Sequence, residues 1–219
     1  AVTVTPTTPS GLVYNENFAY SDFSSGIPQA LYGAAGGSGA PWNHVSGALY
    51  ELQVTNITGT SGLAYLVHTN GEDLGADFIG PTAYDGSQGY VFYTSFTVYC
   101  ALPPSYLGEY FFHLSASGAD TINFRDKVFA NSANAATGKF RFGIANQAGS
   151  VNKQYPRDLM TNATYAVITR YNAATGDSTL WVNPVNEQSS FVTASDNPGS
   201  STIGGVALRQ AGCCTGDLA

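Results

Sequence analysis

The sequence TYAVITRY, residues 164–171, places two tyrosines and a valine on one face of an extended strand, because successive side chains of a strand point to opposite faces. A polar turn, Asn172–Asp177, follows, and Leu180–Val182 (LWV) resumes the β-rich pattern. Two β-rich runs joined by a short loop of Gly, Asn and Asp are typical of an antiparallel hairpin. We therefore predict a β-hairpin over residues 164–182.

Runs of the same kind recur along most of the chain, and no stretch keeps apolar residues at helical spacing among helix-forming neighbours. They predict strands over Ala1–Thr5, Leu12–Phe18, Ala48–Val54, Leu63–His68, Tyr90–Ala101, Glu109–Ser115, Ile122–Phe129, Lys139–Ala145 and Ile203–Arg209. Many strands with Gly and Pro turns indicate an all-β fold, a two-sheet antiparallel β-sandwich of the jelly-roll type. We expect an N-terminal strand and Pro-rich tether over residues 1–11, and one jelly-roll domain over 12–219.

Charge and composition narrow the class of protein. Only 11% of the residues are charged, the net charge is −7 and the pI is about 4.6. Nucleic-acid binding needs a basic face, so this class is excluded. No apolar run approaches the roughly 20 residues of a membrane helix. The Ser, Thr, Asn, Gly and Tyr content favours an exported protein, extracellular or at the cell surface, whose Ala1 follows a cleavage site.

Three cysteines, Cys100, Cys213 and Cys214, are disulfide candidates. Cys100 closes a predicted strand and is able to pair with either member of the vicinal couple, and a strained ring between Cys213 and Cys214 is the alternative. An odd count leaves one thiol over or an intermolecular bridge. Metal binding is the weaker interpretation, because no C-x-x-C pair or His partner lies at ligand spacing.

The hairpin carries a more specific pattern, in Thr164-Tyr165, Arg170-Tyr171, Thr175-Gly176 and Leu180–Pro184, supported by residues 141–144 and 206–210. With these residues the chain resembles the concanavalin-like (LamG-type) jelly-roll superfamily, in particular exported bacterial modules, from about Leu12 onward. Such modules continue into a last strand of the type DDLRVG. Here the sequence stops at Ala219, so we expect the sheet to lack one strand and to expose an edge.

An exposed sheet edge invites pairing with another chain. The N-terminal strand on its Pro-rich tether has the form of a donated strand, joining copies by β-augmentation. The main hypothesis is therefore a structural or adhesive module, a subunit of a self-assembling surface fibre or matrix. The residues expected to carry the assembly are Ala1, Val2, Thr3, Val4 and Thr5.

The resemblance also covers glycoside hydrolases and polysaccharide lyases, so we searched for their catalytic groups. Glycosidases use two carboxylates on either side of the scissile bond, and the superfamily's E-x-D-x-x-E pattern is missing from this sequence. His68 and His113 alternate within predicted strands and are expected to be packed. The lyase grouping of Arg, Gln-x-His and Tyr is also missing. The sequence predicts no enzyme.

The rival hypothesis is a carbohydrate-binding, lectin-like module. Trp42 follows a Gly-rich loop and is expected to be exposed for glycan contact. Asp73, Asp77 and Asp85 share a polar, turn-rich region and are candidate ligands for calcium, which prefers oxygen donors. Asn56 and Asn162 begin N-x-[ST] patterns for glycosylation.

Overall fold

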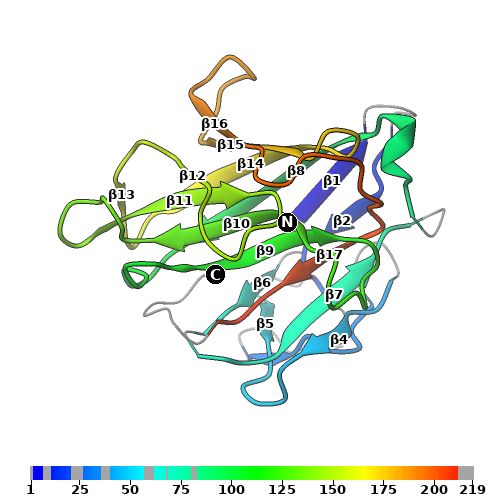
Figure 1. Ribbon diagram of the computed structural model, residues 1–219. Coiled ribbons are helices and arrows are strands. Elements are labelled where there is room, and N and C mark those ends of the chain that lie inside the picture. Colours follow the sequence, from blue (N-terminus) through cyan, green and yellow to red (C-terminus); the bar gives the residue numbers. More distant parts are fainter. Residues whose placement is uncertain are drawn as a thin grey trace.

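The computed structural model describes residues 2–6, 11–20, 27–35, 40–56, 62–67, 69–79 and 83–211, with the backbone alone for 4–6 and 56. Two large antiparallel sheets and one small sheet account for these residues (Figure 1). One short 3₁₀ turn among the described residues, η1 (Gly86–Gln88), precedes one of the two longest strands. The predicted all-β class is confirmed.

The first large sheet has six strands, and the predicted hairpin forms part of it. In spatial order they are β16 (Phe191–Ala194), β15 (Asp177–Val182), β14 (Thr164–Asn172), β8 (Val91–Tyr99), β1 (Val2–Pro6) and β2 (Tyr14–Glu16).

The second large sheet has eight strands. Seven lie in the order β12 (Lys153–Gln154), β11 (Lys139–Ala145), β10 (Arg125–Asn131), β9 (Glu109–Ser115), β17 (Gly205–Leu208), β7 (Asp73–Asp77) and β4 (Asn43–Ser46), and β13 (Leu159–Met160) pairs with β11. The small sheet consists of β3 (Gln29–Ala30), β5 (Gln53–Asn56) and β6 (Gly62–Tyr65).

The strands β3, β4, β12, β13 and β16 lie outside the runs predicted from the sequence. The structure also corrects two predicted segments. Residues 70–89, expected to be a polar loop, contain strand β7, and residues 48–52 lie outside β5. Strand β7 (DLGAD) has little β-propensity, so its pairing depends on contacts from distant segments. A Cβ added at Gly75 would lie 2.1 Å from the carbonyl oxygen of Gly118. Only a glycine allows that loop to lie against β7.

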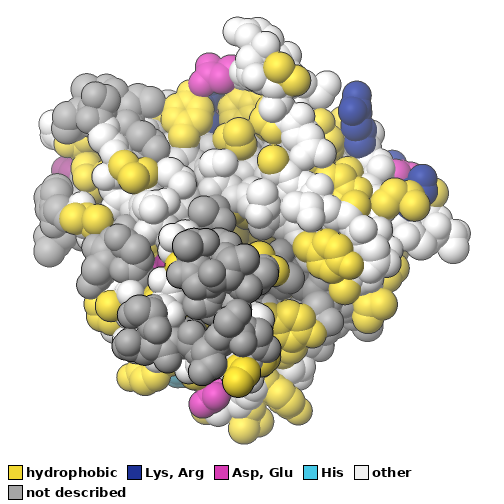
Figure 2. Space-filling view, turned by 180° about the vertical axis from the view of Figure 1, so that it is seen from behind, with side chains coloured by type: hydrophobic (Ala, Val, Ile, Leu, Met, Phe, Trp, Pro, Cys, Tyr) yellow, Lys and Arg dark blue, Asp and Glu magenta, His cyan; other side chains and the backbone are white. Residues whose placement is uncertain are grey.

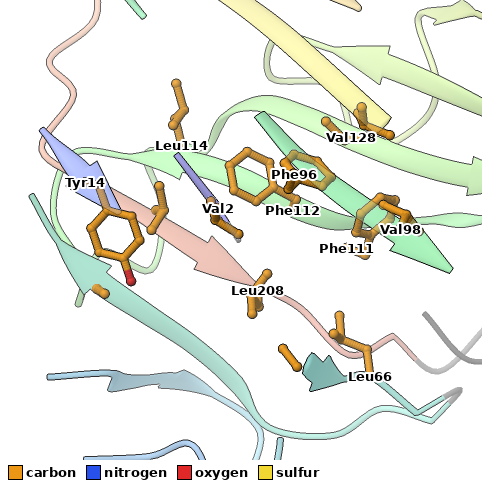
Figure 3. Close-up of a cluster of buried hydrophobic side chains, with 14 of the residues drawn as sticks. Val2, Tyr14, Leu66, Phe96, Val98, Phe111, Phe112, Leu114, Val128 and Leu208 are labelled. Atoms are coloured by element: carbon orange, nitrogen blue, oxygen red, sulfur yellow. The ribbon is translucent and has the colours of Figure 1, made fainter. Parts of the chain in front are cut away.

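The core lies between the two large sheets, where aromatic side chains of both meet (Figure 3). The rings of Phe96 on β8 and Phe112 on β9 have centroids 4.8 Å apart. An irregularity in the β9–β10 register occurs between Val128 and Phe129, and both Phe111 and Phe112 belong to the core cluster. A bulge of this kind turns two successive side chains to the same face.

Strand β1 lies inside the six-stranded sheet rather than outside the sandwich. Thr3 pairs with Ser95 of β8 on one side and with Asn15 of β2 on the other. Val2 is 5% exposed and belongs to the core cluster. The N-terminal strand, expected to be separate from the 12–219 domain, therefore completes the sheet of its own chain. Ala1 lies outside the described residues.

One carboxyl group is buried between the sheets. Asp126 of β10 is 0% exposed, and its Oδ2 accepts a hydrogen bond from Thr169 Oγ1 of β14. Its Oδ1 has no partner among the described residues. Burial disfavours the charged form and raises the pKa of Asp126 to about 7. The core therefore holds an acid that is largely neutral below neutral pH.

This burial makes stability depend on pH. Between pH 4 and pH 7 the folded chain binds one more proton at Asp126 than the unfolded chain, whose aspartate titrates near 3.8. The free energy of unfolding should therefore fall as pH rises through this range and level off above it. Asp126→Asn stays neutral throughout. Between pH 4 and pH 7 the free energy of unfolding of the wild type should therefore fall by a few kcal/mol relative to that of the variant, on the order of the pKa shift. Urea titrations between pH 4 and pH 8 measure the difference.

Asp158→Asn is the control for a carboxyl group whose pKa shifts the other way. The backbone N–H of Ala136 and the guanidinium of Arg141 lower the pKa of Asp158, so its contribution to stability changes mainly below pH 4. Between pH 4 and pH 8 the difference between Asp158→Asn and the wild type should therefore stay nearly constant. An Asp126→Asn profile parallel to that of the wild type would show that the buried carboxyl does not take up a proton in this range.

Candidate functional site

A polar hollow of about 350 Å³ lies on the outer face of the eight-stranded sheet, beside β9 and β10 and under the loop that precedes β12. Leu107, Gly108 and the 149–152 loop form its rim. We call it the amide hollow, because four of its six polar side chains carry amides. These six are Glu109, Asn131, Asn134, Ser150, Asn152 and Gln154.

Strand register places the central amides on one face. Asn131 pairs with Arg141 of β11, and Gln154 pairs with Gly143 of the same strand. Arg141 and Gly143 are two residues apart and so share a face, whereas Phe142 between them is fully buried in the core. Asn131 and Gln154 therefore point away from the core, toward the hollow.

The loop over the hollow is held tightly. A Cβ added at Gly143 would lie 2.6 Å from Val151 Cγ1, so the loop lies directly on the sheet at this glycine. At its start, the carboxylate of Asp196 accepts hydrogen bonds from the backbone N–H groups of residues 146–148, at 2.7, 2.9 and 2.7 Å. Because these bonds stabilise the charged form, they lower the pKa of Asp196 against the effect of its burial. The hollow is thus a preformed feature of the fold.

Asn131 is the most constrained group in the hollow. Its side chain is 1% exposed, and its Oδ1 accepts a hydrogen bond of 2.6 Å from Gln154 Nε2. Gln154 Nε2 also donates to the carbonyl of Ala133, and Gln154 Oε1 accepts from Asn134 Nδ2. The Nδ2 group of Asn131 has no acceptor among the described residues. A buried donor without a partner costs about 1–3 kcal/mol, which favours binding of an acceptor here.

The one carboxylate that lines the described part of the hollow is already paired. Glu109 Oε2 accepts a hydrogen bond of 2.8 Å from Arg209 Nη1, and Arg209 also lies 3.7 Å from Asp73. The Arg209 guanidinium stacks over the ring of Tyr110, 4.3 Å from its centroid. Beyond Tyr110, Lys127 Nζ lies over the same ring and donates to the Gln147 carbonyl. The charges beside the hollow are largely compensated by one another.

His113 lies on the same outer face but is packed, as expected from the sequence. It is 1% exposed, its ring stacks with Phe124 at 4.2 Å, and its Nδ1 lies 3.1 Å from the Leu114 carbonyl. Burial lowers the pKa of His113 to about 3, so the imidazole is neutral. His68 lies outside the described residues.

Trp42 is not the exposed ring that the sequence suggested. It is 1% exposed, and its indole Nε1 donates to Glu16 Oε2 and Tyr20 Oη, both at 3.2 Å. Its ring stacks with Phe18. Glu16 is fully buried, and an unpaired buried carboxylate is costly. The indole N–H of Trp42 donates to it, which explains why the tryptophan lies inside the fold. A ring with so little exposed surface is not available to stack on a sugar.

The three aspartates predicted to bind calcium are not brought together. Asp73 and Asp77 belong to strand β7 rather than to a loop, and Asp85 caps η1. Each carboxylate has its own partner in the chain: Asp73 Oδ2 accepts from Ser46 Oγ (2.7 Å), Asp77 Oδ1 from Gly118 N (2.7 Å) and Asp85 Oδ1 from Ser87 N (2.9 Å). These residues do not fit a shared calcium site. No group of three or more His, Cys, Asp or Glu among the described residues is placed to hold a metal ion.

The disulfide prediction stays open. Cys100 is buried at the end of β8, and its Sγ lies 3.0 Å from the Leu102 carbonyl. Cys213 and Cys214 lie outside the described residues.

The two glycosylation patterns also remain predictions. Asn162 is exposed, and its Oδ1 accepts from the Tyr99 hydroxyl at 3.0 Å. Asn56 ends strand β5 instead of lying in a loop, and its side chain is not described.

The sequence did not point to the amide hollow. Asn131 and Asn134 follow a predicted strand and were indistinguishable from ordinary turn residues, and Gln154 belongs to a two-residue strand that no alternation revealed. The available signal was the density of asparagine and serine between residues 131 and 154.

None of the described helical segments is long and apolar enough to cross a membrane.

The sequence matches no protein-family model and no curated protein sequence. Some solved structures resemble this chain in three dimensions. A seed lectin of Lotus tetragonolobus is 11% identical, with a TM-score of 0.43 over 88% of this chain and 94% of the lectin. The basic lectin of winged bean is 10% identical, with a TM-score of 0.42 over 100% and 95%. An alginate lyase of Pseudomonas aeruginosa is 11% identical, with a TM-score of 0.39 over 99% and 93%.

At these identities and TM-scores the likenesses carry no conclusion about function. The chain's own sheets show an all-β, two-sheet antiparallel β-sandwich.

The buried position of Trp42 yields a stability prediction. Trp42→Phe keeps an aromatic ring but removes the donor to Glu16, so the free energy of unfolding should fall by about 1–3 kcal/mol. Glu16 also accepts hydrogen bonds from the Phe18 N–H and the Tyr20 hydroxyl. In a Glu16→Gln background the same substitution should cost less, since a hydrogen bond to a neutral acceptor contributes less than one to a carboxylate. Chemical denaturation of the wild type, the two single variants and the double variant measures the coupling between Trp42 and Glu16. Strictly additive changes in the free energy of unfolding would contradict this prediction.

Proposed function

We propose that this chain is a non-catalytic carbohydrate-binding module of an exported, LamG-like protein, and that the amide hollow is its saccharide site. The observation that carries the proposal is the buried Asn131 amide, which lines the hollow with an unpaired donor. Asn and Gln side chains present donors and acceptors together. A sugar hydroxyl does the same, so the two are complementary.

Size and charge support a neutral saccharide. Ligand pockets typically measure about 300–1,000 Å³, and the hollow, at about 350 Å³, lies at the lower end of this range. Glu109 is paired with Arg209, so little net charge is directed at a ligand. Figure 2 shows one face of the molecule, on which charged side chains are few among hydrophobic and uncharged ones.

The same geometry supports binding without catalysis. Hydrolysis of a glycosidic bond needs two carboxyl groups on opposite sides of it. Glu109 is the one carboxylate among the described residues that line the hollow, and it is paired with Arg209. The neutral, buried His113 is packed between aromatic rings and leaves no general base exposed there.

A glycan array followed by calorimetry with the best-bound oligosaccharide tests the proposal. Asn131→Ala removes the unpaired donor while Gln154 keeps its bond to the Ala133 carbonyl, so the hollow should persist. Affinity should fall about tenfold or more, as expected for a buried hydrogen bond. Asn152→Ala at the rim should weaken binding less.

Asn123→Ala, an exposed amide outside the hollow, is the matched control and should bind normally. A folded Asn131→Ala protein that keeps full affinity, or an array on which nothing binds, would overturn the proposal.

The assembly hypothesis remains a second candidate, because of the position of β1. This strand is bonded to β8 and β2 in its own chain, and an apolar hollow lined by Val2, Phe96 and Val98 continues along β8 beyond it. Exchange of the strand between two copies would keep the same ladder contacts, which is how domain swapping joins protomers. We propose this exchange as the route to a homo-oligomer or filament.

An engineered disulfide distinguishes the two arrangements. Thr3 and Ser95 are directly opposed in the β1–β8 register, so Thr3→Cys with Ser95→Cys should cross-link efficiently under oxidation. If the strand is exchanged, non-reducing electrophoresis should show covalent dimers or a ladder whose share grows with protein concentration during folding. A cross-linked monomer at every concentration would exclude exchange. Thr3→Cys alone, in the same oxidant, is the control for links through the native cysteines.

A further inference from the structure

A second hollow lies on the opposite side of the sandwich. It measures about 200 Å³ on the outer face of the six-stranded sheet, with walls formed by Tyr93, Ile168 and Trp181 and by the loop Pro184–Glu187. Register explains the shared face: Ile168 pairs with Ser95 of β8 and with Trp181 of β15, and Ser95 is two residues from Tyr93. We call it the loop groove.

The loop that covers this groove is fixed at both ends by hydrogen bonds. Asn183 has a positive φ of 48°, its N–H donates to the Ala166 carbonyl, and its Oδ1 accepts from the Ala166 N–H. The Ser189 hydroxyl accepts from the N–H groups of Val185 and Asn186, at 3.0 and 3.2 Å. The Trp181 indole donates to the carbonyl of Glu187 at 3.2 Å. The groove is therefore preformed, which lowers the entropic cost of binding.

One polar pair stands at the edge of these apolar walls. The Tyr93 hydroxyl donates to Glu187 Oε1 at 2.5 Å, joining residues 94 positions apart. Burial and the neighbouring Glu187 raise the pKa of Tyr93, so the phenol stays protonated and serves as a donor rather than a nucleophile. Glu187 is exposed, and its Oε2 is open to a ligand. The Asn186 side chain beside it is also exposed, with its Oδ1 accepting from the Gln188 N–H at 3.0 Å and its Nδ2 facing solvent.

We propose that the loop groove is a second saccharide site that takes one neutral pyranose ring. Ile168 and Pro184 would contact the C–H face of the ring, and Glu187 and Asn186 would bond its hydroxyls. Trp181, 3% exposed, supports the wall without stacking on the sugar. Arg170 lies opposite Tyr93 in the ladder and interacts with it electrostatically, which disfavours an ammonium ligand. The carboxylate of Glu187 disfavours an acidic sugar.

This site does not depend on the amide hollow. The two lie on the outer faces of different sheets, with the full thickness of the core between them. A module with both sites filled holds two saccharide chains at once, so it would cross-link polysaccharide without forming an oligomer. Such bivalent capture raises avidity without any new contact at either site.

The two tryptophans of the chain provide a direct readout. Trp181 Nε1–H is bonded to the loop that covers the groove, whereas Trp42 Nε1–H is buried with Glu16 and Tyr20. Titration of ¹⁵N-labelled protein with glucose, galactose, mannose and N-acetylglucosamine should move the Trp181 indole resonance with at least one sugar, saturably. The Trp42 resonance should stay in place and serves as the internal control.

Variants locate the effect. Glu187→Ala should abolish the Trp181 shift, and because the indole bonds the backbone carbonyl of Glu187, the anchor of the loop survives the change. Tyr93→Phe should reduce the sugar-induced shift of the Trp181 resonance. Glu51→Ala, an exposed carboxylate in another part of the chain, is the matched control. Asn131→Ala should leave the Trp181 shift unchanged, which separates this site from the amide hollow.

Each of these results would overturn the inference: no shift with any of the four sugars, a shift that persists in the Glu187→Ala protein, or a response to an alkylammonium ion in place of the sugars. Loss of the Trp181 shift in the Asn131→Ala protein would mean that the indole reports on the amide hollow, and would also overturn it.

Discussion

Nine consecutive residue pairs join β8 to β14, from Thr164–Tyr99 to Asn172–Val91, and the rest of the sandwich depends on this ladder. Its register turns Phe92, Phe96 and Val167 into the core. The alternate positions, Tyr93 and Ile168, form the floor of the loop groove on the other face. A slip of one residue would exchange the two faces of a strand, so packing and surface chemistry are specified together.

Neutral polar side chains share with a few carboxylates the role of connecting distant segments. The buried Gln210 accepts from the Val67 N–H and donates to the carbonyls of Tyr50 and Glu72, tying three segments together. Asn183 does the same for the loop after β15. Amide groups satisfy donors and acceptors at once without the desolvation cost of a buried charge. A chain with 11% charged residues can therefore fix long loops, and the same groups line both hollows.

Prediction from sequence succeeded where the pattern is local. The alternation in Thr164–Tyr171 and Tyr90–Ala101 located the two longest strands, because a half-buried strand imposes a period of two on its own residues. It failed at β7, whose pairing depends on Gly75 lying against Gly118. It also failed at Trp42, whose burial depends on Glu16, a residue 26 positions earlier.

The sequence by itself determined the fold class, the central hairpin and the low-charge surface, since these follow from side-chain periodicity, turn residues and composition. Tertiary structure decided where the N-terminal strand lies and which polar groups meet. Asn131 and Gln154 are 23 positions apart and Tyr93 and Glu187 are 94 apart, and no local pattern records such contacts. They arise when sheet register and loop closure bring distant segments together, and the energy of each contact belongs to the pair rather than to either residue.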